Sequence, residues 1–259
     1  MTTLREANLP RDAAELAALT ERHLGRPAVA VMLYGSHARR AATDKSDIDI
    51  LAIVEDRPGS YGDGDVNVTA YRGEHLAWLA SRGSLFVLHL VVDGVVVKDD
   101  AGRLREALSE YRPPADPDSL SREVKAAAEG LMQASPAEVR QYRREMFGLA
   151  VYLARTAAYD MCARMGRPEF DALLALQRLG AESLLPVLAN RRHPEAHLQL
   201  ESALEGLSAL LSVPHPQGPS GLAAAAVAAS ETYPLASRLL SDVLAGGVIN
   251  YTTLSLPPA

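Results

Sequence analysis

The sequence contains very little cysteine and few aromatic residues. Cys162 is the single cysteine among 259 residues, so the chain forms no intrachain disulfide, and a reducing, cytoplasmic setting is the simplest expectation. Aromatic residues make up 5%, so the core has to be built from aliphatic side chains and alanine, which favours helices. The 48% of apolar and 22% of charged residues exclude a disordered or collagen-like chain.

Long hydrophobic runs are also absent. Residues 1–14 lack the apolar segment of a signal peptide, and no run reaches the roughly 18 apolar residues that a membrane span needs. The sequence therefore predicts a soluble cytoplasmic protein with no membrane partner. The 26 Lys and Arg against 32 Asp and Glu give a net charge of −6, and this acidic balance disfavours nucleic acid as a partner.

Two parts of the sequence differ in texture. Residues 28–97 are rich in short β-branched runs, whereas the chain from residue 119 onward is rich in Ala, Leu, Arg and Glu. Between them, Pro113, Pro114 and Pro117 stop helices and favour extended backbone. We therefore expect an α/β (α+β) domain with a mixed sheet at residues 1–118, followed by an all-α helical-bundle domain at residues 119–259.

Turn residues and hydrophobic runs predict the elements within each part. In the first part they predict helices at 11–23, 36–42, 74–81 and 103–111, and strands at 28–34, 47–54, 66–71, 85–92 and 95–98. Residues 58–64 are interpreted as a glycine-rich turn, and Asp93-Gly94 as the turn of a hairpin between the last two strands. In the second part we expect helices near 119–133, 137–165, 168–184, 194–213, 220–232 and 234–245.

A phosphate-binding turn is predicted at Gly35-Ser36, where the apolar strand 28–34 ends and a short helix begins. Glycine allows a sharp turn and a close approach of a ligand to the backbone. Ser36 is a good N-cap, and the unsatisfied N–H groups of a first helical turn attract anions such as phosphate. Arg39, one turn further on, could add positive charge beside that phosphate.

A metal-binding pair is predicted at Asp47 and Asp49. Side chains alternate along a strand, so both carboxylates share one face, about 7 Å apart. Like charges at that spacing are unfavourable alone and are relieved by a hard divalent cation. Mg²⁺ takes oxygen ligands and is usually shared with substrate phosphates, and a two-metal site orients in-line displacement at phosphorus. The turn and the carboxylate pair are therefore complementary halves of one nucleoside triphosphate site.

Gly35-Ser36, ten intervening residues and Asp47-Ile48-Asp49 resemble the signature of the nucleotidyltransferase superfamily, which has the DNA polymerase β-like fold. Residues 11–110 carry the resemblance, and the helical part is similar, more loosely, to the C-terminal domains of aminoglycoside adenylyltransferases. The resemblance implies transfer of a nucleoside monophosphate, usually AMP from ATP, to a hydroxyl. It assigns Asp47 and Asp49 to Mg²⁺ and catalysis. The nucleotide site would comprise Gly35, Ser36, Arg39 and Ser46.

The sequence departs from this family at the third acid. The family pattern often carries a third acidic residue on a neighbouring strand, and the corresponding position here is Asn67. Asp63 and Asp65 lie an even number of positions before Asn67, so either could face the same side if the strand extends that far. An amide orients a water molecule but neither acts as a base nor adds charge. Either the base comes from elsewhere, or the enzyme is slow, or the domain binds nucleotide without transfer. Candidate bases in the second domain are Glu145 and, more weakly, Asp160.

Two functions of different classes remain open. The first is Mg²⁺-dependent transfer to a small hydroxylated acceptor, for which an aminoglycoside-like antibiotic is one class, because an acidic protein suits a cationic sugar. The second is an antitoxin-like or regulatory protein that modifies or binds a protein partner, with weak or absent turnover because Asn67 replaces the third acid.

Overall fold

The computed structural model describes residues 12–44, 46–214 and 220–247. The chain divides into two compact units, with the division between Ala115 and Asp116. Residues 1–11, which include the start of the first expected helix and most of the segment expected to lack a signal peptide, lie outside the described residues.

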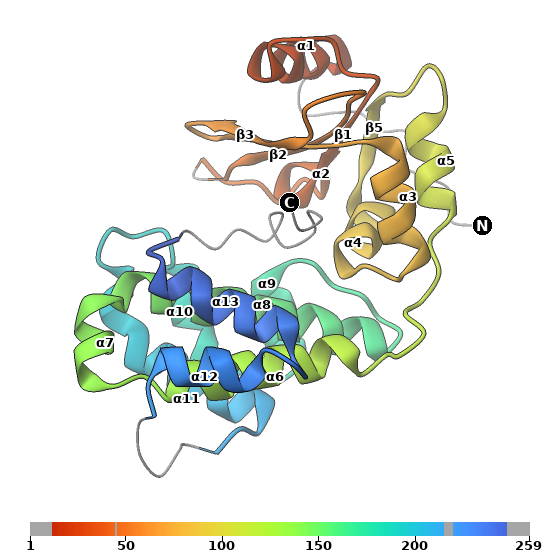
Figure 1. The fold of residues 1–259 in the computed structure, drawn as a ribbon. Coiled ribbons are helices and arrows are strands. Elements are labelled where there is room, and N and C mark those ends of the chain that lie inside the picture. The colour runs from red at the N-terminus through yellow and green to blue at the C-terminus, as the bar shows by residue number, and fades with distance from the viewer. Residues whose placement is uncertain (1–11, 45, 215–219, 248–259) are drawn as a thin grey trace. The chain divides into compact units, whose positions relative to one another are not determined.

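The first unit is built on a five-stranded mixed sheet with the order β3-β4-β2-β1-β5 (Figure 1). Its strands are β1 (Ala30–Tyr34), β2 (Ile48–Ile53), β3 (Gly59–Asp63), β4 (Val66–Tyr71) and β5 (Val95–Lys98). β2 and β4 run parallel, and the other neighbouring pairs are antiparallel. The register places Asp49 directly between Tyr34 of β1 and Asn67 of β4, so the three side chains leave the same face of the sheet.

Helices cover both faces of this sheet (Figure 1). They are α1 (Ala13–Leu24), α2 (Gly35–Ala38), α3 (Gly73–Ser81), α4 (Leu85–Asp93) and α5 (Arg103–Ser109). α1 packs Leu16 against a face that contributes Leu33 and Ile50 to one buried cluster. α4 covers part of the other face, where the Phe86 ring meets the Tyr34 ring edge-on at 5.6 Å. Asp49 alternates with Ile50 along β2 and therefore belongs to the α4 face.

The expected hairpin at residues 85–98 is wrong, because its first strand is the helix α4. A short, continuous apolar run fits a buried helix as well as a buried strand, so periodicity does not separate them here. The polar residues His89 and Asp93 are four apart and share one helical face, where they contact each other. Gly94 ends the helix instead of turning a hairpin, and β5 joins the edge of the sheet beside β1.

The glycine-rich segment at 58–64 is also more ordered than expected. Residues Gly59–Asp63 form β3, which pairs antiparallel with β4 and places Gly62 opposite Asn67. The turn between them is reduced to Gly64 and Asp65, and Gly64 has φ +60°, which glycine adopts without strain. Partly buried Tyr61 packs against the core, which explains how a strand with two glycines is held.

The described residues of the second unit form helices and no strand. The α-helices are α6 (Ser119–Met132), α7 (Pro136–Gln141), α8 (Arg143–Arg164), α9 (Ala172–Arg178), α10 (Leu185–Ala189), α11 (Leu200–Leu211), α12 (Leu222–Ala229) and α13 (Pro234–Leu244); the 3₁₀ helices are η1 (Glu182–Leu184) and η2 (Ala196–Gln199). α8 buries most of its residues. The expected helix at 168–184 is interrupted, because Gly180 adopts φ +68° just after α9.

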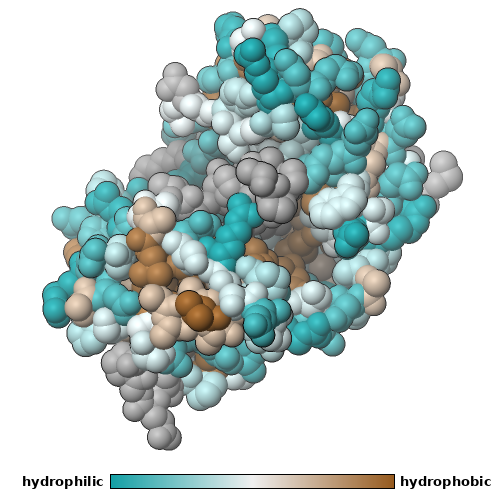
Figure 2. Space-filling model, in the orientation of Figure 1, coloured by the Kyte–Doolittle hydropathy of each residue, from teal (hydrophilic) through white to brown (hydrophobic). Residues whose placement is uncertain are grey.

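Carboxylates hold the beginnings of the last two helices. Glu138 closes a capping box with Ser135 at the start of α7, and its Oε1 also accepts the Leu222 N–H of α12 at 3.0 Å. Glu123 of α6 accepts the Ala236 N–H of α13 at 3.0 Å. Each carboxylate satisfies a backbone donor that a helix start otherwise leaves without an intrahelical partner. Figure 2 shows apolar surface near α12, whose Val227 is 74% exposed.

Among the described residues, no helix by itself combines the length and apolar character of a membrane span. α3 and α4 meet that test only as a pair, and they are bent by 104° relative to each other.

Replacement of Gly94 by alanine should destabilise the first unit by about 1–3 kcal/mol, because it overpacks a filled site. A Cβ at Gly94 would overlap the Leu90 carbonyl oxygen and would lie 2.5 Å from Met32 Sδ. Urea unfolding should give a lower free energy for Gly94→Ala. The matched control is Gly73→Ala, where the nearest atom, of Ile53, is 3.9 Å away; equal stabilities of the two variants would contradict this packing.

Candidate active site

The buried strand β1 leads directly into the predicted phosphate-binding turn. All five of its residues are buried, and Gly35 follows with φ +73°, in the left-handed region that favours glycine. α2 is a single turn, and its N-cap is Tyr34, with no side-chain capping bond. The expectation that Ser36 is the N-cap is therefore wrong: Ser36 lies inside α2, partly exposed, because the chain becomes helical one residue earlier.

Asp49 lies against this turn. A Cβ built on Gly35 would be 2.7 Å from Asp49 Oδ2 and 3.5 Å from its Cγ, so only glycine leaves room for the carboxylate. The antiparallel pairing of Tyr34 with Asp49 produces this contact, since it aligns the end of β1 with the start of β2. The structure thus brings Gly35 and Asp49, fourteen positions apart in the sequence, into direct contact.

Asn67 completes a polar row across the sheet. Its Nδ2 donates a hydrogen bond to Asp49 Oδ1 at 3.4 Å. A Cβ on Gly62, its neighbour on β3, would lie 3.3 Å from Asn67 Oδ1, so the amide also fills the space beside a glycine. Asn67 therefore lies beside Asp49, and its correspondence to the third acid of the family pattern stays a prediction. Of the two other acids considered, Asp65 is exposed, and the side chain of Asp63 lies outside the described residues.

Asp47 and Ser46 lie just before β2. Asp47 is partly exposed and has the same parity as Asp49. Ser46 closes a turn: its Oγ accepts the Thr43 N–H at 2.9 Å, and its own N–H donates to the Thr43 carbonyl at 2.9 Å. The Ser46 carbonyl also lies 3.4 Å from His37 Nε2 of α2. The loop between the two halves of the motif is thus folded back on α2.

The donor set near the turn consists of hard oxygen ligands. Asp47 and Asp49 supply carboxylates of the kind that Mg²⁺ binds, and the Asn67 amide adds an oxygen and a nitrogen. Within the described part of the chain, no group of three or more His, Cys, Asp or Glu side chains could hold a metal. A cation at Asp47 and Asp49 would take its remaining ligands from water or phosphate oxygens, and this metal site stays a prediction.

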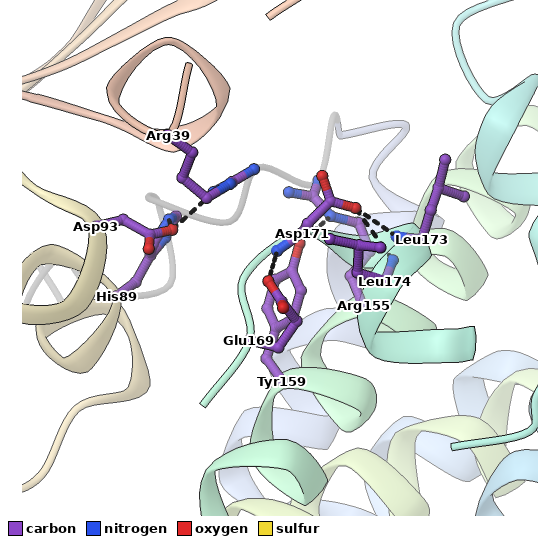
Figure 3. A network of polar contacts seen from close by, with 9 residues as sticks. All are labelled: Arg39, His89, Asp93, Arg155, Tyr159, Glu169, Asp171, Leu173 and Leu174. Carbon is purple, nitrogen blue, oxygen red and sulfur yellow. Dashed lines mark hydrogen bonds and ion pairs between the residues drawn. The ribbon is translucent and has the colours of Figure 1, made fainter. Parts of the chain in front are cut away.

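Arg39 is tied to α4. Its Nη1 donates to Asp93 Oδ2 at 2.7 Å, and His89 Nε2 lies 3.3 Å from the same oxygen (Figure 3). The three side chains are largely buried, at 18%, 10% and 8% exposure for Arg39, Asp93 and His89. Burial opposes ionisation of Asp93, but the hydrogen bonds and charges of His89 and Arg39 outweigh it and lower the pKa of this carboxyl.

Of the three residues in this cluster, only Arg39 is among the site residues predicted from the sequence. The i,i+4 spacing of His89 and Asp93 is the available signal, and it carries meaning only if residues 85–93 are helical. Interpretation of this segment as a strand concealed it, because residues four apart in a strand share a face but are too far apart to touch.

Glu145 and Asp160, the candidate bases, belong to α8 of the second unit. Glu145 is in the first turn and partly exposed. Asp160 is buried and lies 3.8 Å from Arg164 Nη1. Burial raises the pKa of Asp160 to about 6, against the attraction of Arg164 and together with repulsion from Asp118. The role of either carboxylate as a base stays a prediction.

A second polar network in this unit supports the start of α9. Asp171 Oδ1 accepts the N–H groups of Leu173 and Leu174 at 3.0 and 3.1 Å (Figure 3). The Asp171 N–H donates to Glu169 Oε1 at 3.0 Å. These bonds cap the helix.

Comparison with known proteins yields little. No protein-family model matches the chain, and no curated protein matches it. Among solved structures, the chain is similar to a nucleotidyltransferase-like protein from Exiguobacterium sibiricum, with 16% sequence identity, coverage of 77% of this chain and 74% of that chain, and a TM-score of 0.32. A TM-score this low carries no argument about activity, so the functional assignment depends on the residues of this chain.

Asp160→Asn should stabilise the second unit at pH 8 by about 1–2 kcal/mol, since it removes a carboxylate that burial destabilises. The pKa of Asp160 is raised from 3.8 to about 6 on folding, so stability falls as the pH rises from about 4 to about 6, and the loss is complete above that. The gain should therefore shrink between pH 6 and pH 4 and vanish below it. Urea unfolding across this range tests the expectation, with exposed Glu129→Gln as control; a gain independent of pH would contradict it.

Proposed function

We propose that the first unit is a nucleotidyltransferase that moves a nucleoside monophosphate, AMP from ATP, to a hydroxyl of a small molecule, with pyrophosphate as the leaving group. The observation that carries this proposal is the contact between the Gly35 turn and the Asp49 carboxylate. A backbone turn of the kind that can bind phosphate and a carboxylate that attracts cations lie side by side, which is the arrangement that a triphosphate with its counter-ion requires.

Mg²⁺ would be held by Asp47 and Asp49. When bound, it would neutralise charge on the phosphate oxygens during displacement at phosphorus. Asp49 lies on β2 and Asp47 just before it, so this mostly buried strand would fix the position of the cation. The Asn67 amide, bonded to Asp49, would hold one carboxylate rotamer without adding a third negative charge.

The other predicted site residues would have the following roles. Gly35 and Ser36 would present backbone N–H groups and the Ser36 hydroxyl to the triphosphate, while Ser46 holds the loop that joins the turn to β2. The base that would accept the proton of the acceptor hydroxyl stays a sequence-based prediction, with Glu145 as its candidate. An aminoglycoside-like polyol is one acceptor class, because its cationic amines suit a chain of net charge −6.

A second function is favoured by the Asn67 contact. The position beside Asp49 is filled by an amide donor at 3.4 Å, so the row across the sheet contains one carboxylate where a third acid would add another. Such a site could bind a nucleotide with one cation and turn over slowly. The protein would then act as an antitoxin-like or regulatory protein that modifies or binds a protein partner.

Incubation with ATP labelled in the α-phosphate, Mg²⁺ and a panel of aminocyclitols separates these functions. Label on a small molecule supports transfer to a small acceptor, and label on protein supports the second function. Saturable Mg-ATP binding without any labelled product indicates a pseudoenzyme. Absence of Mg-ATP binding contradicts both proposals.

Asp47→Asn combined with Asp49→Asn should reduce Mg-dependent ATP affinity by at least about tenfold, because the carboxylates that would hold the cation are lost. Isothermal titration with and without Mg²⁺ measures this effect, and circular dichroism checks that the variant folds. Asp100→Asn combined with Glu110→Gln, which removes two exposed carboxylates elsewhere in the same unit, is the charge-matched control. Unchanged Mg-ATP affinity in the double variant would remove the metal assignment.

Asn67→Asp should preserve or raise turnover, since it restores a third acid beside Asp49. Without metal the new carboxylate repels Asp49, so the variant should melt at a lower temperature and regain stability with Mg²⁺ more strongly than the wild type. Steady-state kinetics and thermal unfolding at several Mg²⁺ concentrations provide the two measurements. A large loss of turnover in a folded variant would instead assign a role of its own to the amide.

A further inference from the structure

We propose that Asp93 of α4 is a positioning residue for the Gly35 turn and that it acts through Arg39. The inference concerns the first unit alone. It deepens the proposed function, because it identifies what holds the turn that would bind the triphosphate, and it assigns Arg39 to that support instead of to direct phosphate contact.

The turn has little support of its own. α2 contains four residues, begins without a side-chain cap and is followed by Arg40 at φ +60°. At its end, the N–H groups of Arg39, Arg40 and Ala41 donate to carbonyls within residues 35–37. A single helical turn is not stable in isolation, because few hydrogen bonds repay the ordering of its backbone. Contacts with the rest of the unit must hold it in place.

α4 contacts the residues that flank the turn on both sides. Before it, the Tyr34 ring meets the rings of Phe86 and His89 edge-on, each at a centroid distance of 5.6 Å. After it, Arg39 Nη1 donates to Asp93 Oδ2 at 2.7 Å. The His89 and Asp93 contacts come from one face of α4, four residues apart. One helix therefore holds the entry and the exit of the turn.

The end of α4 is itself rigidly placed. Gly94, the next residue after Asp93, packs so closely that a Cβ would lie 2.5 Å from Met32 Sδ, and Met32 is fully buried in the middle of β1. Asp93 is thus fixed relative to the strand from which the turn emerges. A largely buried ion pair with a hydrogen bond constrains its partners more than a surface pair does, since neither group returns to water without breaking it.

The first experiment uses the full chain without nucleotide. In Asp93→Asn, hydrogen exchange at the Arg39, Arg40 and Ala41 amides should be at least about tenfold faster than in the wild type, because local opening becomes easier. Glu21→Gln, which breaks the Lys98–Glu21 ion pair of 3.0 Å in the same unit, is the matched control and should leave these amides unchanged. Unchanged exchange in Asp93→Asn overturns the proposal, because direct phosphate contact by Arg39 predicts no effect in the absence of nucleotide.

The second experiment measures Mg-ATP affinity in a double-mutant cycle. Asp93→Asn and Arg39→Met should each weaken binding by about tenfold, and the double variant should be no weaker than the worse single variant, since both remove one interaction. Effects that multiply to about a hundredfold would show that Arg39 acts on the nucleotide independently, and would overturn the positioning role. If Asp93→Asn does not fold, the hydrogen-exchange and affinity measurements are made on Arg39→Met. Unchanged hydrogen exchange at the amides of residues 39–41 in that variant would overturn the proposal.

The two experiments separate this inference from the proposed function. If the wild type does not bind Mg-ATP, the proposed function fails, while the exchange measurement still tests whether Asp93 supports the turn. If the wild type binds Mg-ATP and the exchange is unchanged in the Asp93 and Arg39 variants, the positioning role fails alone.

Discussion

The contact between Gly35 and the Asp49 carboxylate is the constraint on which the rest of the candidate site depends. It requires a residue without a Cβ, in a left-handed conformation, at the point where β1 ends. It also requires the register that pairs Tyr34 with Asp49, because a slip of one residue would turn Asp49 to the α1 face of the sheet. Ile48 and Ile50, which flank Asp49 on β2 and lie in the α1 core, enforce that register. Packing of apolar side chains on the α1 face of the sheet thus fixes the position of the Asp49 carboxylate on the α4 face.

The sheet presents the polar row of Asp49 and Asn67 on its α4 face and the apolar core on its α1 face. β4 runs parallel to β2, which places Asn67 beside Asp49, and β3 adds Gly62 with room for the amide. The Asn67 donor satisfies one oxygen of a partly exposed carboxylate. Under the proposed function, the Asn67 amide beside Asp49 would decide between fast transfer and simple nucleotide binding, because an amide adds no third negative charge.

α4 links the turn to the rest of the unit, and it is also the element that sequence patterning misassigned. Its apolar, partly β-branched residues suit a strand, and Asp93-Gly94 suits a hairpin turn. The helix instead buries Phe86 and Leu90 and directs His89 and Asp93 toward Tyr34 and Arg39. Local propensity is nearly neutral in this segment, so burial against β1 decides its conformation.

The sequence alone determined the features that depend on local chemistry and strict spacing. The strands at 30–34, 48–53 and 66–71, the glycine at the turn, the parity of Asp47 and Asp49 and the helical character of the second part all follow from periodicity, turn residues and proline positions. Only the tertiary structure decided that Asp49 lies against Gly35, that Asn67 bonds to Asp49 and that Arg39 binds Asp93. These contacts join residues 14, 18 and 54 positions apart. They arise from strand order, register and the packing of α4, which depend on the whole core of the unit and on no short segment of the chain.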